Sequence, residues 1–190
     1  MSAIFDGGLH LLRGGGGGHL LRLLGLLERP ASGEVLLLGQ PTSALDDAAR
    51  ADLRNRRCGF VFAAPFLLAG FSVAETVAMP LFKISQVGPD EARRRTEAVL
   101  EFCGLTAEAQ SVAAALPPAA QHRVSLARAL VNEPALVLVE HPDADIATLL
   151  RQATMRHHLT AIATVQPTFS PEPSDRVLDL AAAATLQPRP

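Results

Sequence analysis

Short apolar runs alternate with polar stretches of helical length along most of the chain. Runs within residues 4–12 and at 59–63, 135–139 and 160–165 have the length of β-strands. The run at 135–139 is apolar throughout and lies between two turns that contain proline, which suits a strand buried on both faces of a parallel sheet. This alternation predicts an α/β fold with a mostly parallel sheet flanked by helices.

Start and stop signals predict the helices between these strands. Capping-box patterns at residues 43–46 and 72–75 each open a helix, because a serine side chain can accept a hydrogen bond from a free amide of the first turn. Residues 89–103 begin with proline and two acidic residues and are followed by a glycine, which is the pattern of a complete helix. A further helix is expected at residues 121–131.

Composition narrows the class of protein. The 190 residues are 48% hydrophobic and 19% charged, which favours one domain with a buried core and excludes disorder. A net charge of -2 without tryptophan or tyrosine argues against a nucleic-acid partner. Cys58 and Cys103 are too few for a disulfide framework and indicate a cytoplasmic compartment. We expect no secretion leader and no membrane span, which needs ~18 apolar residues.

A run of glycines stands between the first predicted strand and an apolar helix at residues 20–27, for which the pattern predicts burial. The order of strand, glycine loop and helix is typical of loops that bind phosphate groups. A flexible connection is the alternative interpretation. The residues of this loop are Gly14, Gly15, Gly16, Gly17 and Gly18.

The order of segments resembles the nucleotide-binding subunit of ATP-binding cassette (ABC) transporters, most of all the lipoprotein-release and macrolide-exporter branch. The residues that carry this resemblance are the glycine loop and residues 20–30, 32–35, 59–62, 66–68, 72–77, 80–81, 123–130 and 175–178. The resemblance implies a P-loop NTPase-like fold in a single domain over residues 1–190. It also implies a small helical subdomain at roughly 64–130 and truncated N-terminal strands.

The glycine loop departs from the family pattern G-x-x-G-x-G-K-[ST]. In that pattern the lysine neutralises phosphates and the hydroxyl holds Mg²⁺. Gly17 and Gly18 stand at those two positions here, and His19 takes the next place. The resemblance therefore implies a degenerate nucleotide-binding loop, with ATP and Mg²⁺ held weakly or not at all.

The other nucleotide motifs are changed as well. The resemblance puts Ala63 at the glutamine that senses Mg²⁺ and Glu140 at the aspartate that holds it. His141 stands at the catalytic glutamate and Val165 at the switch histidine, so we assign no residue to catalysis. We predict no metal site elsewhere in the chain.

The signature motif that meets the γ-phosphate of a partner subunit, Leu-Ser-Gly-Gly-Glu-Gln in the family, is also lost. Two prolines at this place lack the amide hydrogens that a helix N-terminus offers to a phosphate. The signature-equivalent residues are Pro117, Pro118, Ala119, Ala120 and Gln121.

These features lead to a hypothesis of a pseudo-ATPase ABC subunit that binds a transmembrane permease at the inner face of the cytoplasmic membrane. A homodimer or a heterodimer with another cassette is compatible with the resemblance. The expected permease-docking residues are Phe66, Leu67, Leu68, Phe71 and Val73. Two alternatives stay open at this point: an active or weakly active ATPase that drives export, and a non-functional relic or artificial variant.

Overall fold

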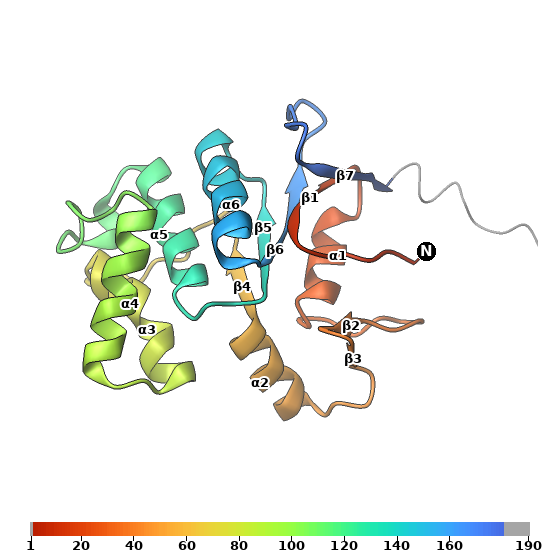
Figure 1. Ribbon diagram of the computed structural model, residues 1–190, viewed down its shortest axis with the longest axis horizontal. Coiled ribbons are helices and arrows are strands. Elements are labelled where there is room, and N and C mark those ends of the chain that lie inside the picture. Colours follow the sequence, from red (N-terminus) through yellow and green to blue (C-terminus); the bar gives the residue numbers. More distant parts are fainter. Residues whose placement is uncertain (1, 181–190) are drawn as a thin grey trace, which may run out of the picture.

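The computed structural model describes residues 2–180, and its centre is a five-stranded sheet (Figure 1). All of its strand pairs are parallel, in the order β4-β5-β6-β1-β7. The strands are β1 (Gly8–Arg13), β4 (Cys58–Val61), β5 (Leu136–Glu140), β6 (Thr160–Val165) and β7 (Arg176–Asp179). The predicted α/β fold with a parallel sheet is therefore confirmed.

Helices cover both faces of the sheet. One face packs against α5 (Pro118–Leu130) and α6 (Ala144–His157), and the other packs against α1 (Gly17–Leu24). The helix α2 (Asp47–Arg57) contacts the edge strand β4, while β2 (Leu36–Leu37) and β3 (Gln40–Pro41) form a separate antiparallel pair. None of the described helices has the length and apolar character needed to cross a bilayer.

Burial along β5 explains its unbroken apolar sequence. Val137 and Val139 belong to the core cluster on the α5 and α6 side, whereas Leu136 and Leu138 belong to the cluster on the α1 side. Successive side chains of a strand point to opposite faces, and here both faces are covered. An apolar residue is therefore needed at each of these positions.

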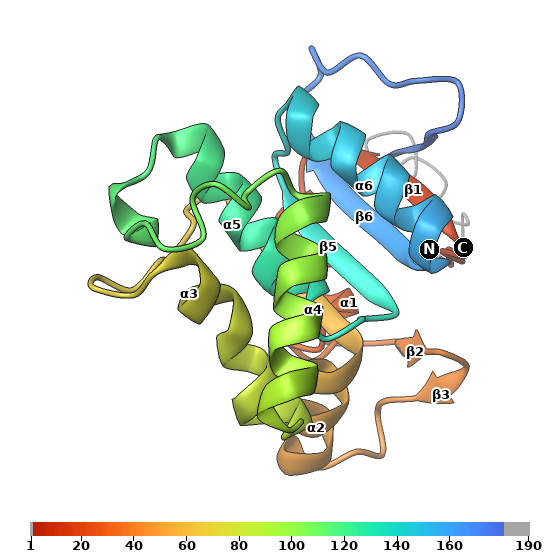
Figure 2. The same ribbon diagram turned by 60° about the vertical axis from the view of Figure 1, so that its left-hand side comes forward.

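A second group of helices stands beside the sheet (Figure 2). It comprises α3 (Val73–Pro80), the π-helical turn η1 (Leu81–Ser85), α4 (Pro89–Phe102) and the short 3-10 helix η2 (Ala113–Ala115). Both α3 and α4 contact α5. The limits 64–130 of a helical subdomain and the single domain over 1–190 stay predictions, and Met1 and residues 181–190 lie outside the described part.

The capping box predicted at Ser72 is confirmed. Its hydroxyl oxygen accepts a hydrogen bond from the Glu75 backbone N–H at 3.2 Å, and the Glu75 carboxylate accepts one from the Ser72 backbone N–H at 2.8 Å. The box satisfies two free amides at the start of α3. It therefore fixes where the chain turns from the loop after β4 into the second group of helices.

Three local predictions are wrong. The N-cap of α2 is Asp46, whose side chain accepts a hydrogen bond from Ala49, while the Ser43 hydroxyl donates to Glu34. A carboxylate is the stronger cap because it also faces the positive end of the helix. The helix predicted at 121–131 begins three residues earlier, at Pro118. The helix predicted to be buried, α1, has only Gly17 and Leu21 buried among its own residues.

An ion pair with little solvent exposure attaches α6 to the segment before β7. The Arg151 guanidinium donates to both carboxylate oxygens of Asp175, at 2.9 and 2.7 Å, and the Asp175 side chain is 0% exposed. Burial acts to raise the pKa of Asp175, but the hydrogen bonds from Arg151 and from the Glu172 backbone N–H outweigh it and lower that pKa. The charged form of Asp175 therefore stabilises the fold.

We expect Asp175→Asn to lower the free energy of unfolding at pH 7 by about 1–3 kcal/mol, because Arg151 then keeps only the more exposed carboxylate of Glu172 as an anionic partner. Because the folded-state pKa is lowered, the advantage of the wild type is complete above the unfolded pKa of about 4 and disappears as the pH falls through the folded value. Urea unfolding at several pH values measures both effects. The control is Asp52→Asn, whose exposed pair with Arg56 is expected to contribute under ~1 kcal/mol. Equal losses in the two variants would contradict the expectation.

Candidate functional site

The glycine loop follows β1 and leads directly into α1. Gly14 and Gly16 have φ values of 103° and 87°, in the left-handed region that side chains disfavour. Gly17 is the first residue of α1 and is buried, and a Cβ atom there would lie 2.8 Å from the Thr164 Cγ2 atom. The loop therefore needs glycine for its turns and for its close contact with the end of β6.

The basic side chains near this loop contact acceptors within the chain. The carboxylate of Glu28 pairs with His19 Nδ1 at 2.8 Å and with Arg22 Nε at 2.5 Å. The hydrogen bond from Arg22 is the main reason why the pKa of Glu28 is lowered. Arg13 donates to the carbonyl of Phe169 at 3.2 Å. An anion at the loop would have to compete with these partners.

Three of the predicted residues lie where parallel strands end. Glu140 closes β5, and its carboxylate accepts a hydrogen bond from the Ala63 backbone N–H at 3.3 Å. His141 has an exposed side chain, and its backbone N–H donates to the Thr164 carbonyl at 3.1 Å. Val165 is 5% exposed. These strand ends thus present one engaged carboxylate and one imidazole, and no group of three or more potential metal ligands occurs among the described residues.

The signature-equivalent residues form the N-terminus of α5. Pro117 is the N-cap and Pro118 the first helical residue, so neither has an N–H to offer. The Gln121 side-chain amide donates to two carbonyls of the preceding turn, at 2.8 and 3.1 Å. Ala119 is exposed, whereas Ala120 is buried. This end of α5 therefore has fewer free donors than an ordinary helix start.

The predicted docking residues differ in exposure. Phe66, Leu68 and Phe71 are exposed by 69%, 52% and 39%, and Leu67 is half-buried. Val73 is 0% exposed and belongs to the main core, so it cannot contact a partner directly. As a surface residue, Val73 is a wrong prediction, because the first turn of α3 directs its side chain inward.

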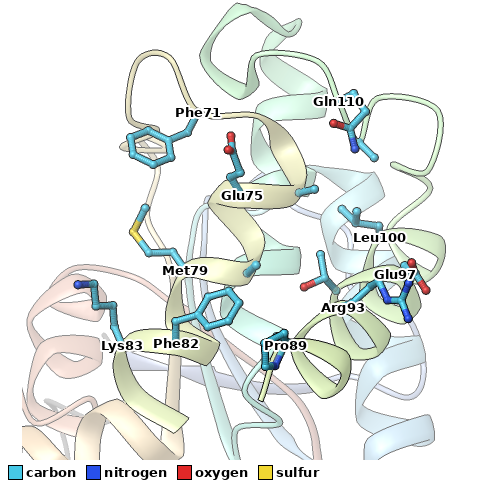
Figure 3. A pocket seen from close by; sticks show the side chains of 15 residues that line it. Phe71, Glu75, Met79, Phe82, Lys83, Pro89, Arg93, Glu97, Leu100 and Gln110 are labelled. Atoms are coloured by element: carbon cyan, nitrogen blue, oxygen red, sulfur yellow. The ribbon is translucent and has the colours of Figure 1, made fainter. Parts of the chain in front are cut away.

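A groove of about 740 Å³ lies beside these residues, between α3, η1 and α4 (Figure 3). Its apolar side chains include Phe71, Met79, Phe82 and Leu100. The charged residues that line it are Glu75, Lys83, Arg93 and Glu97. The groove is thus an apolar hollow with charged residues of both signs along it.

Sequence reasoning missed two residues that shape the site. Ser125 and Arg128 of α5 donate hydrogen bonds to backbone carbonyls at 65 and 66, and His122 pairs with the carbonyl of Ala63. These three polar residues recur every third position along α5, which also contains the polar residues Gln121 and Arg123. That spacing is a signal that the sequence contains, but it does not name the carbonyls that are bound.

The sequence is similar to that of known transporter ATPases. The profile of the ABC transporter family matches residues 12–144. The lipoprotein-releasing system ATP-binding protein LolD of Pseudomonas fluorescens is 43% identical over 133 residues, which are 70% of this chain and 58% of that protein. The matched region therefore spans less than two thirds of the length of this relative.

Solved structures with the same fold include a bacterial ABC transporter cassette. The dimeric structure of MJ0796, a bacterial ABC transporter cassette, has a TM-score of 0.75 at 26% identity and covers 87% of this chain and 77% of its own. A post-hydrolysis state of MJ0796 bound to ADP and Pi has a TM-score of 0.74 at 25% identity, with 88% and 77% covered. CbiO1 from Clostridium perfringens has a TM-score of 0.77 at 22% identity, and the match covers 87% of this chain and 69% of CbiO1. At that identity the likeness shows the fold alone. The predicted P-loop NTPase-like fold is confirmed.

Adjacent glycines of the loop are expected to respond oppositely to a methyl group. Gly17→Ala should lower stability because its Cβ would lie 2.8 Å from the Thr164 methyl group, whereas Gly18→Ala should gain ~0.5–1 kcal/mol of helix propensity. Urea unfolding of the two variants measures the difference. Thr164→Ser removes the methyl group and should restore the stability of Gly17→Ala. Equal stabilities of the two alanine variants would contradict the close contact.

Proposed function

Because the chain belongs to the ABC transporter family, we propose that it is a cassette subunit that docks on a membrane permease without driving ATP hydrolysis. The single observation that carries this proposal is the state of the glycine loop. It has neither a lysine nor a hydroxyl, and the neighbouring side chains of His19 and Arg22 pair with Glu28. ATP and Mg²⁺ would therefore be held weakly or not at all.

The ends of the strands support the same conclusion. Hydrolysis in this family needs a metal-holding carboxylate, a residue that polarises water and a switch histidine. Glu140 is engaged by Ala63, and Val165 has no titratable group. Removal of a single group of this kind lowers enzyme rates by a factor of about 100 or more. We infer that the chain does not turn over ATP at a useful rate.

The groove between α3 and α4 supports the docking part of the proposal. An amphipathic helix binds a groove of this kind through an apolar stripe, and a permease helix with such a stripe would fit here. Phe71, Met79 and Phe82 would receive that stripe, while Lys83 and Glu97 stand at the sides (Figure 3). The residues that line the groove are not residues of the nucleotide motifs, so changes in those motifs leave its lining intact.

The likeness to LolD extends the proposal to the type of system. We propose a permease of the lipoprotein-releasing type as the partner and a position on the inner face of the cytoplasmic membrane. Pairing with a second cassette, identical or different, is part of the proposal, since MJ0796 is a dimeric cassette. With both its loop and its signature altered, this chain would leave neither composite site of a heterodimer complete.

An active or weakly active ATPase is the second candidate. The observation in its favour is the backbone of the loop, which keeps left-handed glycines and leads into a helix N-terminus. It requires that backbone amides alone hold the phosphates. A non-functional relic is the third candidate, and it would bind neither ATP nor a permease.

Calorimetric titration with Mg-ATP tests the nucleotide part. We expect no binding by the native chain up to millimolar ATP, because the loop lacks a cation and a metal-binding hydroxyl. The comparison protein carries Gly17→Lys and Gly18→Ser in a Thr164→Ser background, which relieves the contact at Gly17. Micromolar binding by the native chain would favour the ATPase candidate and contradict this proposal.

A charge placed in the groove tests the docking part. Phe82 is 51% exposed, so Phe82→Glu should leave the fold stable yet raise the Kd for a lipoprotein-release permease in nanodiscs at least tenfold. The control is Leu36→Glu, at a residue that is 59% exposed on β2 and does not line the groove. Equal affinities of the two variants would exclude the groove as the docking site.

A further inference from the structure

A second hollow lies at the edge of the sheet opposite the glycine loop. It has a volume of about 320 Å³ and lies between α4, the ends of α5 and α6, and the starts of β5 and β6 (Figure 2). Pro134 and Leu159, which line it, come just before β5 and β6, whereas the glycine loop, Ala63 and Glu140 stand where strands end. None of the described residues that line it belongs to the nucleotide motifs or to the groove between α3 and α4. The hollow is therefore a separate place on the molecule.

The floor of this hollow is apolar and buried. Val131 and Leu159 are each 2% exposed and Leu130 is 7% exposed, while Val99 and the Phe102 ring are half-buried on the α4 side. A hydrocarbon group that replaces water on such a floor is bound favourably. The volume is at the lower end of the range for sites that hold small molecules. The floor therefore suits a short apolar group.

Charged side chains, most of them positive, line the same hollow. They are those of Arg94, Arg95, Arg156 and Glu133. Arg94 and Arg95 share the carboxylate of Glu91, at 2.7 and 2.5 Å, and the Arg95 Nη1 atom lies 3.4 Å from the Glu133 carboxylate. Hydrogen bonds from Arg94 and Arg95 lower the pKa of Glu91 to about 2, so this carboxylate is charged at neutral pH. Three positive charges thus meet two negative ones, and one positive charge is left unbalanced.

Arg156 carries the unbalanced charge. Its guanidinium carbon lies 5.9 Å from the centroid of the Phe102 ring, which also meets the His157 ring edge-on, and no hydrogen bond or ion pair joins Arg156 to another described residue. Glu101 lines an adjoining hollow that shares Arg156 and Phe102, yet its carboxylate does not pair with this guanidinium. A guanidinium presents two parallel N–H donors that match the two oxygens of a carboxylate. Arg156 is therefore free to bind an anionic group next to the apolar floor.

We propose that this hollow binds a small monocarboxylate with an apolar tail, which lies on the floor at Val131 and Leu159 while its carboxylate pairs with Arg156. One unbalanced positive charge matches a monoanion, whereas a phosphate group brings up to two negative charges. The site is independent of the proposed function, since it uses neither ATP nor a permease. Because α4 belongs to the second group of helices and α6 covers the sheet, a bound molecule would link these two parts of the fold.

Calorimetric titration of the full chain with straight-chain carboxylates tests the class of ligand. Affinity should rise about two- to fourfold for each methylene added from butanoate upward, because each one leaves water, and it should level off once the hollow is full. Octanoate should bind with a Kd below about 1 mM, and octanol, which lacks the charge, at least tenfold more weakly. No binding of octanoate up to about 10 mM would overturn the site. Affinity that does not depend on chain length would overturn the apolar floor, and equal affinities for octanoate and octanol would overturn the pairing with Arg156.

Two variants locate the ligand in the hollow. Arg156→Gln should weaken octanoate binding about tenfold, whereas Arg56→Gln, which removes an exposed arginine outside the hollow, should not. Ala98 is exposed and lines the hollow, so Ala98→Phe should fill part of it and weaken binding at least tenfold. Its control is Ala49→Phe, at an exposed alanine of α2.

Urea unfolding should give the four variants midpoints close to that of the wild type, because all four residues are exposed. Unchanged octanoate binding in Ala98→Phe would place the ligand elsewhere and overturn the site. Unchanged binding in Arg156→Gln would overturn the role of that guanidinium.

Discussion

Burial of β5 on both faces is the constraint on which the rest of the structure depends. Its four apolar residues separate two core clusters, one under α5 and α6 and one under α1. Because β4, β5, β6 and β1 run parallel, their carboxyl ends lie along one edge of the sheet. That edge therefore brings together residues far apart in sequence, such as Gly17, Ala63 and Glu140. Their placement depends on the strand order and not on the chemistry of their side chains.

The sequence predicted the parts of this structure that depend on local pattern. The unbroken apolar run of β5, the capping box at Ser72 and the start of α4 at Pro89 were all found, because each has a distinctive local composition. The start of α2 was missed because two residues competed as caps, and only the folded chain engages Ser43 with Glu34. Burial of Val73 was missed for a similar reason, since it depends on which face of α3 meets the core.

The candidate site also divides into features that the sequence predicted and features that depend on long-range contacts. The resemblance located the glycine loop and Glu140 by their order in the chain, and both lie at the expected edge of the sheet. Long-range partners were beyond the sequence: the bond from Ala63 to Glu140 joins residues 77 positions apart, and those from Arg128 join residues 62 and 63 apart. The family resemblance puts Glu140 at the position that holds Mg²⁺, but in this structure its carboxylate accepts a hydrogen bond from the Ala63 backbone N–H.

The groove between α3 and α4 contains the chain's single lysine side chain, Lys83. The only side-chain primary amine of the protein therefore lies in this groove. A reagent selective for lysine would label the groove and leave the glycine loop, the strand ends and α5 untouched. This gives the protein a natural covalent handle at the surface where a partner would sit, and protection of that one amine would report occupancy of the groove.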